Sequence, residues 1–376
     1  MINIKENKSS FSDKSLVQQI RRDNNPKRNY LLVNSKQGKH IPCSPTDSLK
    51  LFGELAETIK EEIKNKNTLF IGFAETATAI GAAVASHFEN SFYIHTTREN
   101  ISDDLSVVDF KEEHSHAVEQ KLCSSDWESI SREADCIVFV EDEISTGKTI
   151  MNFINALRSE NKVRPDTRFL ACSILNGMTD EREKELAEHG VRFHYLVRLE
   201  VSGISNELYV YEEKKQELPS SIPYELITIN GKLDPRTSVK TLDYIKACGD
   251  LSDSILERIC FDGLDAAIIG TEECMFPAIS TAAAVAEKTS AKSIVTHSTT
   301  RSPIYPDSNG DYPIKTRFMV ESLYEDERRT YIYNSDSTCY DIVLFLTDSE
   351  KENVCIDKLI GAFSSAKKFI LVRWVK

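Results

Sequence analysis

Short apolar runs alternate with amphipathic stretches along the first half of the chain. The apolar runs predict buried strands at 30–33, 68–72, 91–96, 137–140 and 168–175. Apolar residues at helical spacing predict helices over 46–65, 79–88, about 150–157 and 179–189. Strands that alternate with helices favour a parallel sheet covered by helices on both faces. We therefore expect an α/β fold.

The pattern breaks around residues 212–225, where a charged run is followed by a proline-bearing stretch that ends at Pro223. This composition is typical of a junction between domains. An α/β pattern then restarts in the second half. We expect an N-terminal arm over residues 1–30, a first parallel-sheet domain over 31–215 and a second over 216–376.

The two halves of the sequence resemble each other. The shared segments are Leu69–Gly72 and Tyr93–Arg98 in the first half, and Ala267–Gly270 and Val295–Arg301 in the second. A strand similar to 137–140 recurs at 343–346, but Thr347 and Asp348 follow it and no glycine-bearing loop comes next. Two explanations stay open: the second domain is a diverged duplicate of the first, or two α/β units are similar by chance. A different strand order in the two domains would contradict the duplication.

The most informative segment is Ile137-Val138-Phe139-Val140-Glu141-Asp142-Glu143-Ile144-Ser145-Thr146-Gly147-Lys148-Thr149. It predicts a buried strand, carboxylates where the strand ends, and a small hydroxyl-rich loop that leads into a helix. The unpaired N–H groups at a helix N-terminus bind anions, and a glycine lets the backbone approach the ligand closely. Carboxylates repel a phosphate but accept hydrogen bonds from sugar hydroxyls. The segment therefore predicts a site for a ribose and a phosphate together.

A nucleoside-triphosphate P-loop is the nearest alternative, because Gly147-Lys148-Thr149 matches the end of that motif. The P-loop also requires a glycine five positions before Gly147, and residue 142 is Asp. The P-loop interpretation therefore fails.

Residues 137–149 resemble the phosphoribosyl-pyrophosphate (PRPP) signature of type I, orotate-like phosphoribosyltransferases. The resemblance implies that Glu141 and Asp142 bind the ribose hydroxyls as catalytic-site residues. It also implies that the following residues hold the 5′-phosphate: Ser145, Thr146, Gly147, Lys148 and Thr149. Glu143 departs from the family pattern, which has a small or aliphatic residue there.

Two further strand ends are candidates for the same site, and a polar connection is a third. Residues 72–78 take the place of the family's pyrophosphate loop, with Ala74, Glu75 and Thr76 as candidate PRPP-binding residues. Thr97 and Arg98 end the next strand, and the Arg98 fork suits pyrophosphate oxygens.

The polar connection after residue 99 carries Glu113, His114 and His116, in the interval where the family has its mobile catalytic loop. A closed loop there would exclude water from the reaction. Two alternatives stay open, a zinc site at the His-x-His pair and a solvated loop without a catalytic role.

The second half contains Thr300-Arg301-Ser302-Pro303, the tetrapeptide after which the TRSP domain family is named. Segments 233–237 and 318–321 are also similar to that family. TRSP domains occur fused behind orotate-phosphoribosyltransferase-like domains in gene clusters linked to tellurite and stress resistance. A second ligand site is expected at the carboxyl edge of the second sheet; its candidates are Glu272, His297, Thr300, Arg301 and Ser302. Helix capping and salt bridging are the alternative role for these residues.

The composition limits the compartment and the partners. The 376 residues carry a net charge of −13 and no basic tract, so a nucleic-acid partner is not expected. No apolar stretch reaches the roughly 18 residues of a membrane span, and the first residues lack a signal-peptide core. Nine cysteines without a CxxC pair indicate reduced thiols. We expect a cytoplasmic protein without a membrane partner.

The expected function is transfer of ribose 5-phosphate from PRPP to a small nitrogenous base, with release of pyrophosphate. The expected cofactor is Mg²⁺, held through PRPP near Glu141 and Asp142 and not by the protein alone. A homodimer and products of the same gene cluster are further candidate partners. Two alternatives stay open: a PRPP-binding sensor or scaffold without turnover, and a phosphoribohydrolase or phosphatase centred on the second half.

Overall fold

A computed structural model of the chain describes residues 2–26, 28–110, 120–203, 207–213, 223–352 and 354–376. The chain forms two compact units, and each draws on segments that are distant in sequence. Unit 1 comprises Met1–Asp13, Lys50–Ile204 and Leu233–Ile245, and unit 2 comprises Lys14–Leu49, Ser205–Lys232 and Lys246–Lys376. The domain borders expected after residues 30 and 215 stay predictions.

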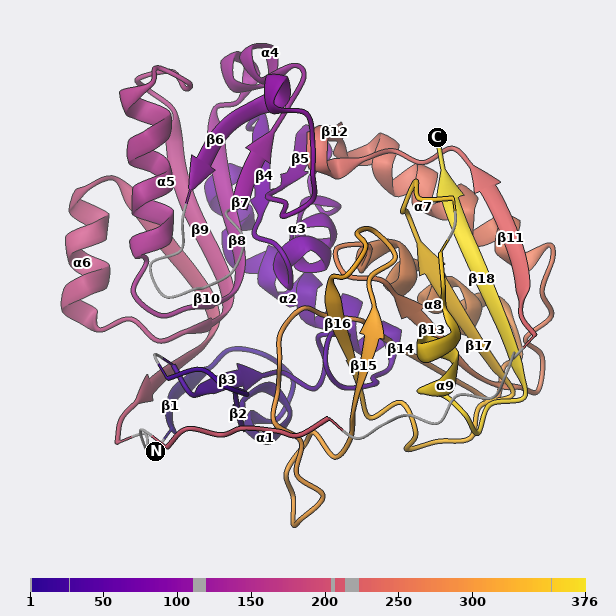
Figure 1. Cartoon of the computed structure of the whole chain (residues 1–376). Helices are drawn as coiled ribbons and strands as arrows, with labels where there is room; N and C mark the ends of the chain where they lie inside the picture. The colour runs from indigo at the N-terminus through magenta and orange to yellow at the C-terminus, as the bar shows by residue number, and fades with distance from the viewer. Residues whose placement is uncertain (1, 27, 111–119, 204–206, 214–222, 353) are drawn as a thin grey trace. The chain divides into compact units, whose positions relative to one another are not determined.

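Unit 1 is built on a seven-stranded sheet of order β1-β10-β9-β8-β4-β5-β12 (Figure 1). Its strands are β1 (Ile2–Asn7), β4 (Thr68–Gly72), β5 (Ser91–His95), β8 (Cys136–Ile144), β9 (Arg168–Asn176), β10 (Val191–Val201) and β12 (Val239–Lys240). The five central strands are parallel, and β1 and β12 pair antiparallel at the two edges. A separate antiparallel pair, β6 (Ser106–Phe110) and β7 (Gln120–Cys123), completes the strands of this unit.

Most helices of unit 1 lie in the connections between its strands. They are α2 (Pro45–Ile63), which begins in unit 2, α3 (Ala77–Ala85), α4 (Trp127–Glu133), α5 (Lys148–Ser159) and α6 (Asp180–Glu188), with the short η1 (Asp103–Leu105) and η2 (Pro235–Thr237). The short α1 (Asp13–Leu16) begins in unit 1 and continues in unit 2. The connection β4-α3-β5 runs across the sheet in one direction, and β8-α5-β9-α6-β10 runs in the other. Because such crossovers are right-handed, α3 covers one face of the sheet and α5 and α6 cover the opposite face.

The strands and helices predicted for the first half are present, with ends shifted by a few residues. The strand predicted at 137–140 is longer, because β8 continues beside β9 as far as Ile144, with Glu141 opposite Ser173. The acid pair therefore lies within the last strand residues and not after the strand. The predicted strand Tyr30–Val33 is β3, which pairs with β2 (Gln18–Arg21) in unit 2.

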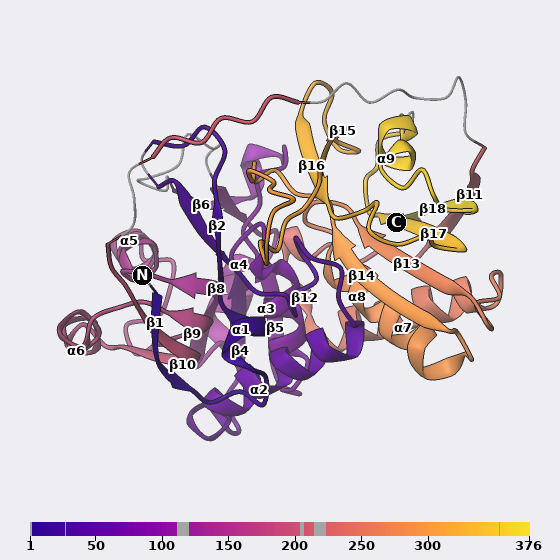
Figure 2. The same ribbon diagram turned by 90° about the horizontal axis from the view of Figure 1, so that it is seen from below.

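Unit 2 contains a five-stranded, fully parallel sheet of order β11-β18-β17-β13-β14. Its strands are β11 (Glu225–Asn230), β13 (Asp265–Gly270), β14 (Ser293–Ser298), β17 (Ile342–Thr347) and β18 (Lys368–Val375), with the antiparallel pair β15 (Arg317–Glu321) and β16 (Arg329–Tyr333). α7 (Thr241–Leu256), which begins in unit 1, and α8 (Phe276–Lys288) cover one face, and α9 (Asp357–Gly361) covers the other (Figure 2). The expected second parallel sheet is confirmed.

Four strands with counterparts in both halves have the same order in the two units. The order is β5-β4-β8-β9 in unit 1 and β14-β13-β17-β18 in unit 2. The register also agrees, because Gly72 pairs with Val140 and Gly270 pairs with Leu346. The fifth strand differs: β10 follows β9 along the chain, whereas β11 precedes β13. The strand order therefore agrees with the duplication hypothesis, with the fifth strand supplied from the other end of the second domain.

Candidate functional site

The expected site segments of unit 1 start at the same level of the sheet. Gly72, at the end of β4, pairs with Val140 on one side and with His95 on the other. Because these neighbouring strands are parallel, their carboxyl ends meet at one edge. The crossovers from β4 and β8 run in opposite directions, so the switch point of the sheet lies between these two strands. Open α/β sheets bind ligands at such a point.

Three segments continue from this level of the sheet: two follow the ends of β4 and β5, and the third begins within the last residues of β8. We call residues 141–149 the signature loop, residues 73–78 the β4 loop and residues 96–98 the β5 end. The structure brings the three segments to the same edge of the sheet, as the sequence predicted from their places after parallel strands. Their roles as PRPP-binding or catalytic residues stay predictions.

The carboxylates of the signature loop are half-buried. Glu141 Oε1 accepts a hydrogen bond from the amide of Asp142 at 3.1 Å, and Asp142 Oδ1 accepts one from the amide of Glu143 at 3.0 Å. Alternation along a strand places Glu141 and Glu143 on one side of β8 and Asp142 on the other. Glu143 therefore belongs to the same side as the first acid of the pair.

The rest of the signature loop is a tight turn into α5. Gly147 has a φ of 66°, and a Cβ at this residue would lie 2.5 Å from Leu186 Cδ1. Ser145 and Thr146 are exposed, and Thr146 Oγ1 accepts a hydrogen bond from the amide of Lys148 at 3.3 Å. Both reasons for a glycine, the positive φ and the close neighbour, therefore apply at the centre of the loop.

Contacts from α6 support the loop. The Arg182 Nε donates a hydrogen bond to the Thr146 carbonyl at 3.0 Å. Met178 and Phe193 also line the space beside Gly147. Arg182 was not expected near the site, since nothing in its local sequence indicates a contact 36 residues away.

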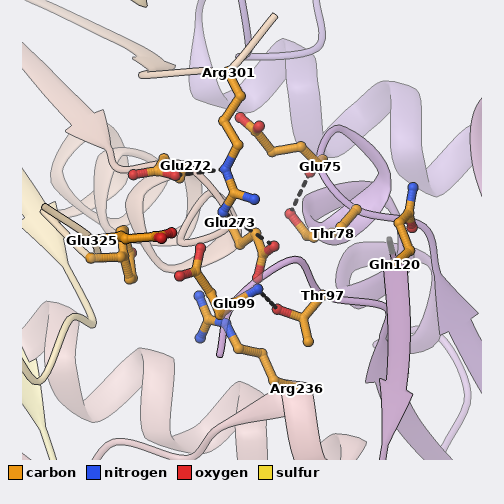
Figure 3. Close-up of polar contacts among 12 residues, drawn as sticks. Glu75, Thr78, Thr97, Glu99, Gln120, Arg236, Glu272, Glu273, Arg301 and Glu325 are labelled. Carbon is orange, nitrogen blue, oxygen red and sulfur yellow. Dashed lines mark hydrogen bonds and ion pairs between the residues drawn. The ribbon is translucent and has the colours of Figure 1, made fainter. Parts of the chain in front are cut away.

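The β4 loop is held by a chain of buried hydrogen bonds. The Ala74 amide donates to Thr96 Oγ1 at 2.8 Å, and that hydroxyl donates to Gln120 Oε1 at 2.6 Å. Thr78 Oγ1 donates to the Glu75 carbonyl at 3.0 Å (Figure 3). Thr76 precedes the first residue of α3. Thr96 and Gln120 were missing from the predicted site residues, because only the fold brings them to the Ala74 amide.

The β5 end is tied to β7. Thr97 is buried and exchanges two backbone hydrogen bonds with Lys121, each of 2.9 Å. Its hydroxyl accepts a hydrogen bond from the Glu99 amide at 3.0 Å (Figure 3). Arg98 is half-buried. The candidate lid residues Glu113, His114 and His116 lie outside the described residues, and their role stays a prediction.

The predicted second-domain residues divide into two groups. Glu272 and Arg301 form an ion pair at the end of β13, with 2.7 Å between Glu272 Oε2 and Arg301 Nε (Figure 3). His297 instead lies inside β14, is 1% exposed and has its ring 6.1 Å from that of Phe363. Burial lowers the pKa of His297 to about 3.

Thr300 and Ser302 make mainly backbone contacts. Thr300 exchanges two backbone hydrogen bonds with Tyr331, at 2.9 and 2.7 Å. The Ser302 amide donates to Thr300 Oγ1 at 3.1 Å, and the Ser302 carbonyl accepts a hydrogen bond from Tyr333. These contacts fit a structural role as well as a ligand site.

Two features of the described residues concern the expected cofactor and compartment. In the described part of the chain, no three His, Cys, Asp or Glu side chains are grouped so that they could hold a metal ion. No helix formed by the described residues is both long and apolar enough to cross a membrane. The nine cysteines are all free, and six of them are buried.

Comparison with known families decides the classification. A family model described as "Phosphoribosyl transferase" matches residues 16–203, which is half of the chain. The chain belongs to this family. A second model, described as "TRSP domain C terminus to PRTase_2", matches residues 243–363. The resemblance stated from the sequence, a phosphoribosyltransferase domain followed by a TRSP domain, is confirmed.

Solved structures that resemble this phosphoribosyltransferase family member are distant. The APRTase from Giardia lamblia is 13% identical, with 49% of this chain and 94% of that chain covered and a TM-score of 0.36. The adenine phosphoribosyl transferase from Trypanosoma brucei is 15% identical, with 49% and 76% covered and a TM-score of 0.35. The orotate phosphoribosyltransferase from Aeropyrum pernix is 16% identical, with 46% and 78% covered and a TM-score of 0.28. Likeness at this level carries no argument about substrate. No curated protein matches the chain.

Proposed function

We propose that the phosphoribosyltransferase domain transfers ribose 5-phosphate from PRPP to a ring nitrogen of a small base and releases pyrophosphate. The observation that carries the proposal is the common level of Gly72, Val140 and His95 in three neighbouring parallel strands. It gives one edge of the sheet both an acid pair and two loops with amides and hydroxyls. The acid pair can accept hydrogen bonds from the ribose hydroxyls. The amides and hydroxyls of the loops can donate hydrogen bonds to the 5′-phosphate and the pyrophosphate.

The residue roles follow from chemistry at this edge. Glu141 and Asp142 accept hydrogen bonds from the ribose hydroxyls. The amides and hydroxyls of residues 145–149, at the start of α5, receive the 5′-phosphate. The β4 loop and Arg98 receive the pyrophosphate, where the guanidinium fork donates to two oxygens.

The reaction needs no covalent enzyme intermediate. The bond between ribose C1′ and the pyrophosphate oxygen breaks, and its electron pair leaves with pyrophosphate. The lone pair of the base nitrogen forms the new bond to C1′, and the nitrogen's proton passes to solvent. Fixed donors and acceptors around the ribose stabilise the positive charge that develops during the transfer.

The acid pair also fits Mg²⁺. This ion prefers oxygen ligands and is usually held by one or two carboxylates together with substrate phosphates. Glu141 and Asp142 supply such carboxylates at the strand end where the phosphates would bind. When bound, Mg²⁺ would neutralise charge on the pyrophosphate.

The test is release of pyrophosphate from PRPP in the presence of Mg²⁺ and a panel of purine, pyrimidine and smaller heterocyclic bases. The proposal expects release that depends on one class of base and yields the matching nucleotide. Asp142→Asn should abolish most of this release, and Asp243→Asn, an exposed change on α7, is the matched control. Binding of PRPP with no turnover of any base would instead favour a sensor or scaffold. Ribose phosphate formed without base dependence would favour a hydrolase.

A further inference from the structure

The loop after β13 in unit 2 repeats the hydrogen bonds of the β4 loop in unit 1. The Thr96 amide donates to the Gly72 carbonyl at 2.9 Å, and the Thr299 amide donates to the Gly270 carbonyl at 3.0 Å. Thr96 and Thr299 are therefore equivalent positions. By this register the counterpart of His95 is Ser298, and not the adjacent His297.

The threonine hydroxyls extend the correspondence. Thr96 Oγ1 accepts a hydrogen bond from the Ala74 amide at 2.8 Å, and Thr299 Oγ1 accepts one from the Glu272 amide at 3.0 Å. Ala74 and Glu272 are thus equivalent, and so are the glutamates that follow them, Glu75 and Glu273. At the first of these positions the side chains differ, a methyl group in unit 1 and a carboxylate in unit 2. The backbone differs there too, because the Ala74–Glu75 peptide is cis and Glu272 has a φ of 48°.

Arginines correspond as well. Counting on from the equivalent threonines, Arg98 in unit 1 matches Arg301 in unit 2. The residues between them also match in structure, because Thr97 pairs with Lys121 of β7 and Thr300 pairs with Tyr331 of β16. The strand pair β15-β16 therefore takes the place in unit 2 that β6-β7 takes in unit 1.

The Glu272 carboxylate is buried, with 1% of the side chain exposed, and is surrounded by donors. It lies 2.7 Å from Arg301 Nε and 3.1 Å from Arg328 Nη1, and it accepts a hydrogen bond from the Ser322 hydroxyl. Both arginine side chains are only 13% exposed. Two guanidinium groups and a hydroxyl around one buried anion are the donors that a phosphate group would also take.

We propose that the carboxyl edge of the second sheet is a phosphate-type anion site whose ligand is the protein's own Glu272 side chain. The carboxylate accepts from Arg301 and Arg328, which also pair with Glu273 and Glu325, and it takes the donors that a phosphate group would need. Unit 2 therefore does not bind free pyrophosphate at this edge unless Glu272 is removed. The assignment of pyrophosphate as the matching ligand rests on the proposed function of the β4 loop.

The experiment converts Glu272 to the residue found at the equivalent position of unit 1. Inorganic pyrophosphate is titrated calorimetrically into the full-length wild type and into Glu272→Ala. We expect one more pyrophosphate site per chain in Glu272→Ala than in the wild type. An equal number of sites in the two proteins would overturn the proposal.

Two further variants test whether the additional pyrophosphate site depends on the loss of Glu272 and on Arg301. Glu273→Ala removes the neighbouring acid, which is 3.6 Å from Arg301 and has a counterpart in unit 1, and should gain no site. Adding Arg301→Gln to Glu272→Ala should abolish the additional site. A gain in Glu273→Ala, or an extra site that survives the loss of Arg301, would contradict the assignment.

The number of sites separates this proposal from the function proposed for unit 1. If unit 1 does not bind pyrophosphate, the wild type has no site and Glu272→Ala still gains one. If Glu272→Ala cannot be obtained folded, Glu272→Gly carries the test, because glycine also removes the carboxylate and adopts the φ of 48° found at this residue. Pyrophosphate must then raise the unfolding midpoint of Glu272→Gly more than that of the wild type. Equal shifts would overturn the proposal.

Discussion

Gly147 and Leu186 approach each other so closely that a Cβ on the glycine would lie 2.5 Å from Leu186 Cδ1. Gly147 also has a φ of 66°, which costs an L-residue about 1–2 kcal/mol. The contact joins the signature loop to α6, whose Arg182 donates to the same loop. The shape of the proposed phosphate site therefore depends on a helix that begins 33 residues after the glycine, at Asp180.

Gly147→Ala should therefore lower PRPP affinity strongly, because Leu186 or the loop must move. Gly190→Ala is the matched control: Gly190 has a φ of 82°, but a Cβ there would meet its nearest neighbour only at 3.9 Å. Gly190→Ala should lose about 1–2 kcal/mol in the free energy of unfolding from its positive φ, and Gly147→Ala should lose more because of the additional clash with Leu186. Only Gly147→Ala should raise the Kd of PRPP, measured by calorimetry. Equal PRPP affinities in the two variants would contradict the role of the Leu186 contact.

Asp142→Asn tests the ribose contact of the acid pair. The amide keeps the size of the side chain but removes the charge that strengthens hydrogen bonds from hydroxyl donors. A hydrogen bond to a charged group contributes about 1.5–3 kcal/mol, so kcat/KM for PRPP should fall by roughly 10- to 100-fold. Steady-state pyrophosphate release measures this change. Unchanged kcat/KM would remove Asp142 from the site.

Glu143→Gln tests whether the third acid contacts the ligand together with Glu141 and Asp142. Alternation along β8 places Glu143 on the side of Glu141, and its half-buried side chain has partners of its own. If Glu143 only stabilises the loop, Glu143→Gln should lower the free energy of unfolding and leave the KM for PRPP unchanged. A rise in KM comparable to that of Asp142→Asn would assign Glu143 to the ligand.

Local sequence was sufficient to predict four of the five parallel strands of unit 1 and the segments at their carboxyl edge. Leu69, Phe70 and Ile71 are fully buried, and a strand of this kind has no polar positions that could confuse its assignment. β10 was missed because Arg192, His194 and Arg198 interrupt its apolar residues next to the edge strand β1. These polar positions of β10 result from its place beside the edge strand, and the local sequence pattern does not reveal that place.

The polar contacts of the sites were harder to predict than the strands. Gln120 meets Thr96 across 24 residues, and Arg328 meets Glu272 across 56. Such pairs form only when the strand order is in place, so neither partner has a local signature. The correspondence of Ala74 with Glu272 likewise depends on hydrogen bonds, from the two loop amides to Thr96 and Thr299, which the sequence pattern does not reveal.

The buried His297 predicts how stability depends on pH. Burial lowers its pKa from 6.5 to about 3, so between these values the unfolded chain holds a proton that the folded chain does not. Stability from this residue is complete above pH 6.5 and is lost as the pH falls toward 3. The loss is about 1.4 kcal/mol per pH unit, or roughly 2 kcal/mol at pH 5.

Urea unfolding at pH 7 and pH 5 measures this loss. In His297→Leu the difference in unfolding free energy between the two pH values should be smaller than in the wild type by about 2 kcal/mol. His189→Gln is the control, because His189 is exposed at the end of α6 and should leave the difference unchanged. An unchanged pH dependence in His297→Leu would show that the folded protein accommodates the protonated ring.

Thr96 and Thr299 offer a matched pair that separates catalysis from stability. Each hydroxyl accepts a hydrogen bond from a loop amide, of Ala74 or of Glu272, and both threonines are buried. Replacing either with valine keeps the shape and leaves that amide without its acceptor, at a cost of about 1–3 kcal/mol in the free energy of unfolding. Thr96→Val should also lower kcat/KM for PRPP, because the β4 loop loses its anchor. Thr299→Val should leave kcat/KM unchanged, since its loop holds the Glu272 carboxylate in place of a substrate; a comparable loss of activity in Thr299→Val would assign part of the reaction to the second unit.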